Sequence, residues 1–316
     1  MSNQKVIAIV GATGAQGGGL ARSILGDRAG EFTVRAITRD VDTDKARALA
    51  AAGAQVVTAD LSDPDSVRRA FAGAYGAYCV TFFWNHMSPD QERAEARAMA
   101  DAARDAKLQH VVWSTLEDSR RWVKLDDPRM PTLMGHYKVP HFDVKGEADA
   151  FFRASGVPTT MLLTSFYWDN LIYFGMGPKE GPDGKLYFSL PMGQKPLPGI
   201  AAEDIGRCAH GLFKRVGEFT GKTVGIAGEH LTGAQMAAGL SHALGREVVH
   251  QDVPFDVFRS LGFPGADDLG NMFQFNHDFS EDFCRARSIE FSRSLNPKLQ
   301  SFADWLGDHG GQIPIG

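Results

Sequence analysis

The residues best suited to chemistry stand near the start of the chain, where glycines follow an apolar run. Residues 6–10 (VIAIV) are typical of a buried parallel strand, and Gly11, Gly14 and Gly17 follow at spacings of three. Such glycines allow a tight turn, a close approach of backbone N–H groups to a pyrophosphate, and close packing of the next helix. Because a strand precedes the turn and a helical segment follows it, the pattern predicts a dinucleotide site. Its residues are Gly11, Ala12, Thr13, Gly14, Ala15, Gln16 and Gly17.

A cation stands at the end of the second expected strand, residues 32–38. Arg39 follows that strand, about 20 residues after the last of these glycines, where an acid would bind the ribose of NAD and a cation the 2′-phosphate of NADP. Arg39 therefore favours NADP(H), with NAD(H) as the alternative. The next residues, 40–45, hold three acids and one lysine, which weakens the positive field. Arg39 could equally be a solvated arginine that pairs with Asp40 or Asp42.

Strand and helix patterns alternate along the first half of the chain. This alternation predicts an α/β fold, a Rossmann-type doubly wound parallel sheet, whose ligands lie at the carboxyl ends of the strands. Asp60 and Leu61 follow the third strand and are placed to meet the adenine, although Asp60 could instead cap the turn before Pro64. Thr81 and Phe82 end the fourth strand and Phe83 follows it, at the carboxyl end of the sheet where the cofactor is expected. The expected strands are residues 6–10, 32–38, 54–59, 77–82, 110–114 and 159–163.

The pattern loosens after the sixth strand. We expect a dinucleotide-binding domain at residues 1–164 and a smaller α+β substrate or partner domain at 165–316, with about 200–230 returning to the first. Residues 117–140 form an irregular connection, and connections of this length are often functional lids. Our hypothesis is that this stretch becomes ordered when the cofactor binds.

Composition excludes several classes of protein. The chain has 316 residues, 43% of them hydrophobic and 22% charged, as expected for a globular protein. We expect no membrane helix, because no apolar run approaches about 20 residues, and no signal peptide, because the first strand starts at once. Three cysteines without CxxC spacing indicate reduced thiols, a cytoplasmic protein and no metal site. The net charge of −5 argues against nucleic-acid binding.

Taken together, the motifs resemble those of the NADPH-sensor proteins in the NmrA-like family, a branch of the atypical short-chain dehydrogenases. The resemblance runs from residue 6 to beyond residue 300. It implies a Rossmann domain that binds NADP(H), and a regulatory role in which the dinucleotide changes partner binding or dimerisation. The motifs are residues 11–18 (GATGAQGG), 38–39 (TR), 141–147 (HFDVKGE), 169–170 (DN), 261–266 (LGFPGA) and 271–273 (NMF).

The resemblance also implies further contacts with the cofactor. Lys145 would complete the site near the nicotinamide, together with Tyr167, Trp168, Asp169 and Asn170. Two positions depart from the family pattern, because Thr43 and Ala94 stand where the family has cations. These departures leave the choice between NADP and NAD open.

Whether this protein can be a catalyst depends on the roles of His141 and Lys145. Reductases of the wider superfamily use Tyr-x-x-x-Lys on one helix face, where the lysine makes the tyrosine a better acid. Here His141 occupies the tyrosine position, and Ser114 ends the fifth strand as the superfamily's serine does. In one interpretation Lys145 only binds ribose and the protein is a sensor. In a second, His141 or Lys145 acts as the acid of a reductase. In a third, both are surface residues and the cofactor site is lost.

If the protein is an enzyme, its aromatic residues indicate the substrate. A lining of aromatic side chains favours a flat aromatic or quinone-like carbonyl or enone. These residues are Phe82, Phe83, Trp84, Tyr167 and Trp168.

Overall fold

The computed structural model describes residues 4–27 and 29–316. The chain forms two compact units. Unit 1 comprises residues 1–118, 144–163 and 203–224, and unit 2 comprises residues 119–143, 164–202 and 225–316. The domain bounds expected from the sequence stay a prediction.

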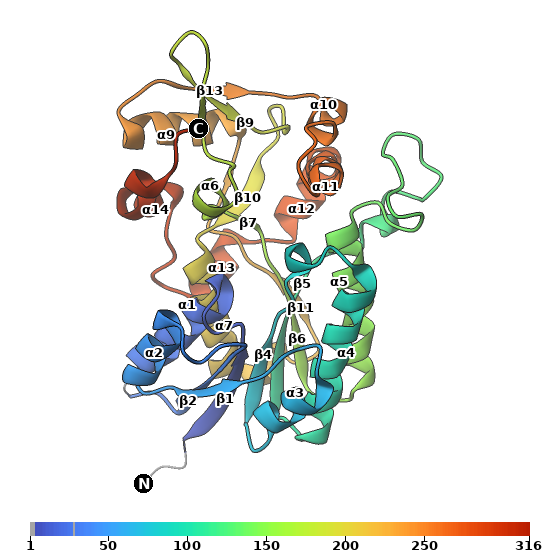
Figure 1. The fold of residues 1–316 in the computed structure, drawn as a ribbon, viewed down its shortest axis with the longest axis vertical. Helices are drawn as coiled ribbons and strands as arrows, with labels where there is room; N and C mark the ends of the chain where they lie inside the picture. Colours follow the sequence, from blue (N-terminus) through green and yellow to red (C-terminus); the bar gives the residue numbers. More distant parts are fainter. Residues whose placement is uncertain (1–3, 28) are drawn as a thin grey trace. The chain divides into compact units, whose positions relative to one another are not determined.

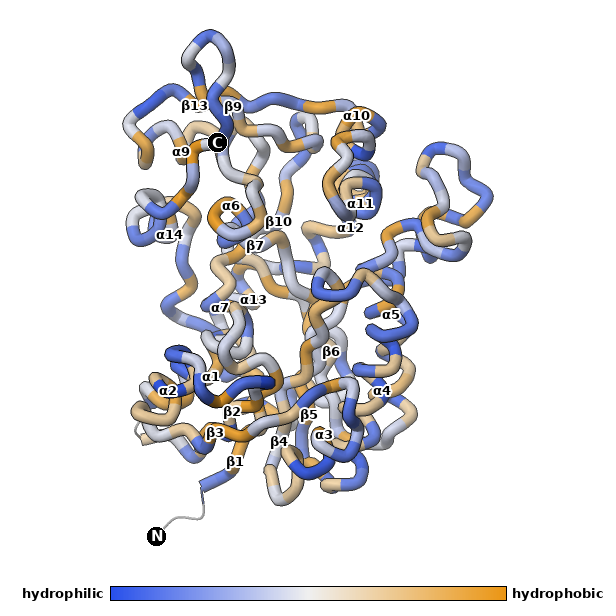
Figure 2. The backbone as a smooth tube through the Cα atoms, in the orientation of Figure 1, coloured by the Kyte–Doolittle hydropathy of each residue, from blue (hydrophilic) through white to orange (hydrophobic). Residues whose placement is uncertain are grey.

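Unit 1 is built on a seven-stranded sheet with the order β11-β6-β5-β4-β1-β2-β3. Neighbouring strands from β6 to β3 pair in parallel, which confirms the α/β, doubly wound prediction. Figure 2 colours β1 at the hydrophobic end of its scale, and Ile7, Ala8 and Ile9 are fully buried. The strands are β1 (Lys5–Val10), β2 (Phe32–Thr38), β3 (Gln55–Thr58), β4 (Gly76–Cys79), β5 (His110–Thr115), β6 (Thr159–Leu163) and β11 (Thr223–Gly225).

Helices cover both faces of this sheet. In Figure 1, α3, α4 and α5 lie on one side of the sheet, and α1, α2 and α7 lie on the other. Helices α1 and α7 touch backbone to backbone, since a Cβ on Gly206 would lie 2.0 Å from the nitrogen of Leu20. These helices are α1 (Ala15–Gly26), α2 (Asp44–Ala51), α3 (Pro64–Phe71), α4 (Pro89–Asp105), α5 (Pro140–Ala154) and α7 (Ala202–Lys214).

The core of unit 1 lies between β5 and the helices on its face. All six residues of β5 are buried, and the Trp113 ring stacks on Phe152 with centroids 4.5 Å apart. Burial raises the pKa of the Cys79 and Cys208 thiols. Cys284 is half-buried, and all three thiols are free, as the sequence predicts.

Unit 2 contains two three-stranded sheets, ordered β12-β10-β7 and β13-β9-β8. The strands are β7 (Phe166–Tyr167), β8 (Lys179–Glu180), β9 (Leu186–Ser189), β10 (Leu197–Ile200), β12 (Glu229–Leu231) and β13 (Val248–Gln251). The helices are α6 (Asn170–Tyr173), α9 (Gly233–Leu244), α10 (Phe255–Arg259), α11 (Ala266–Asp278), α12 (Ser280–Arg285), α13 (Ile289–Leu295) and α14 (Phe302–His309), while the short α8 (Val216–Phe219) belongs to unit 1.

Backbone carbonyls of the irregular stretch before α5 accept hydrogen bonds from side chains of α11. The side-chain amide of Asn271 on α11 donates to the carbonyls of Pro131 and Lys138, and that of Gln274 donates to Arg129. The buried Asp143 accepts from the backbone N–H groups of Ser119, Lys138 and Val139. Cofactor-dependent ordering of this stretch stays a hypothesis.

The structure corrects the expected end of the fourth strand. The fourth strand ends at Cys79 rather than at residue 82, because the chain turns into a 3-10 helix, η1 (Phe83–Asn85). Thr81 and Phe82 therefore lie in the irregular connection between β4 and η1. Among the described residues, no helix combines the length and apolar character needed to cross a membrane.

Candidate functional site

The glycine turn has the geometry that its spacing predicts. Gly11 has φ +64°, and the N–H of Gly14 donates to the Gly11 carbonyl over 2.8 Å. A Cβ on Gly17 would lie 2.5 Å from that same carbonyl oxygen, so the helix can approach the strand only without a side chain there. Among the described residues, no side chain caps the start of α1. Its first N–H groups point toward the turn, as in sites that bind phosphate.

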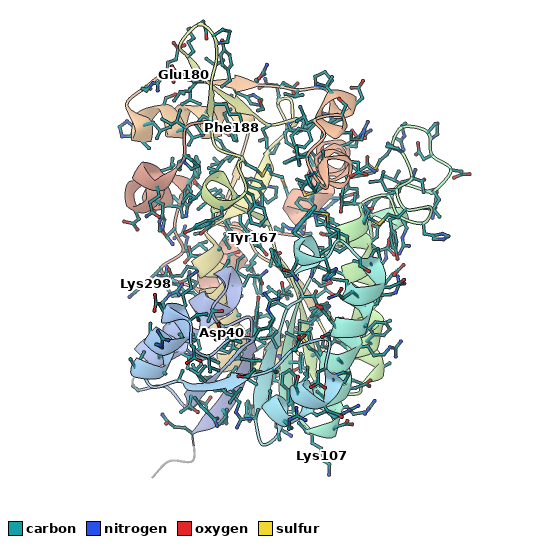
Figure 3. The ribbon with its side chains drawn as sticks, viewed as in Figure 1. Asp40, Lys107, Tyr167, Glu180, Phe188 and Lys298 are labelled. Atoms are coloured by element: carbon teal, nitrogen blue, oxygen red, sulfur yellow. The ribbon has the colours of Figure 1, made fainter. Side chains whose placement is uncertain are left out.

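Charged residues follow β2 and β3 at the same end of the sheet as the glycine turn. In Figure 3, Asp40 marks the carboxyl end of β2, and Lys107 marks the opposite end of unit 1. The carboxylate of Asp60 accepts from the backbone N–H and the hydroxyl of Ser62. These bonds, and more weakly the charge of Arg39, lower the pKa of Asp60. Asp60 therefore caps its turn, as the alternative interpretation expects, and lies within the field of Arg39.

The acidic loop after Arg39 is structured by its own hydrogen bonds. The backbone N–H of Asp42 donates to the Asp40 carboxylate, and the Thr43 hydroxyl accepts from the N–H of Ala46 to cap α2. Thr43, where the resemblance implies a cation, thus has a structural role in capping α2.

Lys145 is held inside unit 1 by three acceptors. Its ammonium donates to the Thr81 hydroxyl over 2.6 Å and to the Thr81 carbonyl over 3.2 Å. It lies 2.7 Å from Oε1 of Glu92, a fully buried residue of α4. The Thr81 hydroxyl donates to that same oxygen, and the ammonium lies 5.5 Å from the ring centroid of Trp113. Since an ammonium has three N–H groups, these three acceptors can engage all of them.

The other oxygen of Glu92 faces a histidine. Nε2 of His86 lies 3.3 Å from Oε2 of Glu92 and 3.9 Å from Oε2 of Glu95. Nδ1 of His86 accepts from the backbone N–H of Ser88 over 3.0 Å. Among the described residues, Nε2 of His86 and Oε2 of Glu92 are buried without a hydrogen bond, so the ring and the carboxylate are in close electrostatic contact only. Side-chain atoms of His86, Glu92 and Glu95 lie within 4.8 Å of one another. The ammonium 2.7 Å from Glu92 already supplies a cation to this cluster, which favours an ion pair over a metal site.

His141, one turn before Lys145 in α5, is held by unit 2. Its Nδ1 lies 2.7 Å from Oδ1 of Asp268, and its backbone N–H donates to Oδ2 of the same carboxylate. Since a carboxylate only accepts, Nδ1 carries the proton. The partners of Lys145 described above lie in unit 1, so the two side chains are fixed by different parts of the protein.

The remaining predicted contacts, residues 167–170, also belong to unit 2. The Trp168 ring is buried in the core of this unit, 5.3 Å from Phe302 between ring centroids. The Asp169 carboxylate accepts from the backbone N–H of Ala202. A role of these residues at the cofactor stays a prediction.

The aromatic residues after β4 differ in their exposure. Phe82 is 54% exposed, whereas Phe83 is buried against Trp84 and His86. Of the two, only Phe82 presents its ring to solvent.

Glu92 and His86 are not predicted as site residues from the sequence. The helix period gives a signal for Glu92, which shares a face with Ala96, Met99 and Ala103, all of them fully buried. A carboxylate on an apolar helix face needs a buried partner. No comparable pattern identifies His86, whose position depends on the turn after β4.

Comparisons with known proteins extend over most of the chain. The model of the NmrA-like family matches residues 3–306. An NmrA-like family domain-containing oxidoreductase, lnbB of Aspergillus flavus, is 26% identical over 87% of this chain and 84% of its own. The related FrzB of Cladobotryum sp is 26% identical over 85% of this chain and 83% of its own.

Solved structures show the same fold. The crystal structure of Nmra, a negative transcriptional regulator, in complex with NADP has a TM-score of 0.78 at 23% identity and covers 96% of this chain and 94% of its own. The triphenylmethane reductase of Citrobacter sp., complexed with NADP(H), has a TM-score of 0.74 at 20% identity and covers 96% of this chain and 99% of its own.

Proposed function

The chain belongs to the NmrA-like family, and from that premise we propose that it is an NADP(H)-binding regulator. The dinucleotide would bind at the glycine turn of unit 1, with its pyrophosphate at the start of α1. Arg39 would meet the 2′-phosphate. The bare backbone at Gly17 fits this group, because any side chain there would collide with the turn. Nmra, which shares the fold, has been crystallised with NADP and with NAD.

The state of Lys145 is the observation that carries the regulatory role. Its ammonium is engaged by Thr81 and paired with the buried carboxylate of Glu92. These acceptors can engage all three N–H groups of the ammonium, so the geometry favours a fixed binding contact over proton transfer. We therefore assign Lys145 the role of a fixed positive charge that binds the dinucleotide and transfers no proton.

Titration of the purified protein tests this assignment. We expect NADPH to quench the intrinsic fluorescence with saturation, and we expect no oxidation at 340 nm against quinones and aromatic aldehydes. Sedimentation with and without NADPH then measures whether occupancy changes self-association. Failure of both NADPH and NADH to bind contradicts the proposal.

A reductase is the second candidate, and the Asp268–His141 pair favours it. A carboxylate that fixes the tautomer and orientation of an imidazole is the arrangement of many acid–base sites. The curated relatives are named oxidoreductases, and the exposed Phe82 could receive a flat substrate. Turnover of NADPH that is lost in His141→Asn, while binding persists, would establish this second function.

A further inference from the structure

We propose that Glu92, in contact with His86, is the counter-ion that keeps Lys145 charged, and that it thereby makes dinucleotide binding insensitive to pH. This inference rests on the proposed NADP(H) site. It assigns a positioning role to two residues, one on α4 and one in the turn before it.

The charges around Lys145 leave Glu92 as its direct counter-ion among the described groups. From the end of β4, Thr81 contributes only neutral oxygens, and from β5 Trp113 contributes a ring. Asp149 lies one turn further along α5, but its carboxylate accepts from Trp113 and Thr115. The charge of Lys145 therefore depends on the single carboxylate 2.7 Å away.

His86 and Glu95 surround the far side of Glu92. Nε2 of His86 lies 3.3 Å from the second oxygen of Glu92, and Nδ1 accepts from the N–H of Ser88, which holds the ring in place beside the carboxylate. Glu95 lies beyond His86, where Gln91 donates to it over 2.9 Å. Burial raises the pKa of Glu95, so the charge of this second carboxylate is easier to lose than that of an exposed one.

Removal of the Glu92 charge would leave a buried ammonium without compensation. Burial penalises the charged form of a lysine, so in Glu92→Gln the ammonium would lose its proton at a lower pH than in the wild type. The dinucleotide carries negative phosphates, and a site that loses a cation binds them less tightly. The variant should therefore bind NADPH progressively more weakly as the pH rises, while the wild type should not.

The experiment is a set of NADPH titrations between pH 6.5 and 9.5, followed by intrinsic fluorescence. We expect the Kd of the wild type to stay within about twofold and that of Glu92→Gln to rise about tenfold toward high pH, a change of about 1.4 kcal/mol. Lys145→Met should bind weakly with a flat profile. Asp101→Asn also removes a carboxylate from α4, at a position where it pairs with Arg104, and serves as the matched control, with an expected flat profile.

The outcomes separate this inference from the proposed function. Parallel profiles for wild type and Glu92→Gln overturn the inference and leave the NADP(H) site intact. A wild type that binds no NADPH at any pH overturns the proposed function instead.

Stability provides a second test that does not need the dinucleotide. If Glu92→Gln destabilises the fold because it leaves Lys145 uncompensated, the double variant Glu92→Gln/Lys145→Met should be more resistant to urea than Glu92→Gln alone. No recovery in the double variant overturns the inference. His86→Asn should give a pH profile between those of the wild type and Glu92→Gln, since it removes the ring that contacts Glu92 and keeps the carboxylate.

Discussion

Lys145 and His141 lie one turn apart in the same helix, yet they belong to two different environments. Lys145 is paired with Glu92 inside unit 1, and His141 is paired with Asp268 inside unit 2. Helical spacing alone would assign the two residues to one catalytic pair. The difference teaches that the chemistry of a side chain depends on its tertiary partner. Two residues at a familiar catalytic spacing can take part in two independent interactions.

The largest expected effect comes from Lys145→Ala. Truncation leaves Glu92 buried without its cation, which should lower the free energy of unfolding by about 3–5 kcal/mol. NADPH affinity should also fall about tenfold, which corresponds to about 1.4 kcal/mol. Urea unfolding and fluorescence titration measure the two effects. Lys138→Ala is the matched control, because this buried lysine of unit 2 donates only to carbonyls. Its variant should lose stability but keep its affinity.

The buried His110 should make the free energy of unfolding depend on pH. Unlike His141, it is bonded to a hydroxyl, that of Thr160, and burial lowers the pKa of His110 to about 4. The unfolded chain then binds the extra proton first, so this contribution to stability is complete above about pH 6.5 and is lost as the pH falls toward 4. The loss amounts to about 3 kcal/mol. Urea unfolding at several pH values should show a shallower decline in His110→Gln, and an unchanged decline would contradict this account.

Asp268→Asn breaks only the pair in unit 2. The cost should be about 1–3 kcal/mol in the free energy of unfolding, because His141 keeps a weaker acceptor. NADPH affinity should stay within about twofold, a small fraction of the 1.4 kcal/mol that a tenfold change requires. A marked loss of affinity would break the comparison, since it would tie His141 to the dinucleotide.

Arg39→Ala tests whether unit 1 selects the phosphate form of the cofactor. We expect NADPH affinity to fall about tenfold, or about 1.4 kcal/mol, and NADH affinity to change little. Arg47→Ala, which removes an exposed arginine paired with Asp44 on α2, is the control. Equal losses for NADPH and NADH would remove Arg39 from the 2′-phosphate site.

The smallest effect concerns residues 117–140. If this stretch becomes ordered only with the cofactor, saturating NADPH should slow its proteolysis. Its backbone bonds to Asn271 and Gln274 lead us to expect similar cleavage rates with and without NADPH. Strong protection by NADPH would instead support cofactor-dependent ordering of this stretch.

The glycine turn and the parallel sheet could be predicted from the sequence because local patterns determine them. Gly11 and Gly17 stand next to the strand and helix that they join, and the apolar period of each strand is visible within a few residues. The end of β4 was misjudged because apolar residues after Cys79 continue the pattern while the backbone turns into η1.

The buried pairs could not be predicted with the same ease. Glu92 and Lys145 are 53 positions apart in the numbering, and His141 and Asp268 are separated by 127. A sequence gives the residue types of such pairs but not their pairing, which depends on how the helices pack. Trp168 shows the same dependence on packing, because the burial of its ring in unit 2 follows from neighbours such as Phe302, which is far away in the sequence.

The packing of Gly206 against Leu20 has a consequence for synthesis of the protein. Helix α7 and strand β11 belong to unit 1 but stand after residue 200. A growing chain that has emerged only to residue 164 therefore lacks an edge strand and the helix that covers α1. The ribosome must deliver about 60 more residues, most of them from the other unit, before unit 1 can close, and long-range closure of this kind slows folding. Synthesis of unit 1 thus begins first, but its folding can be completed only after much of unit 2 has been synthesised.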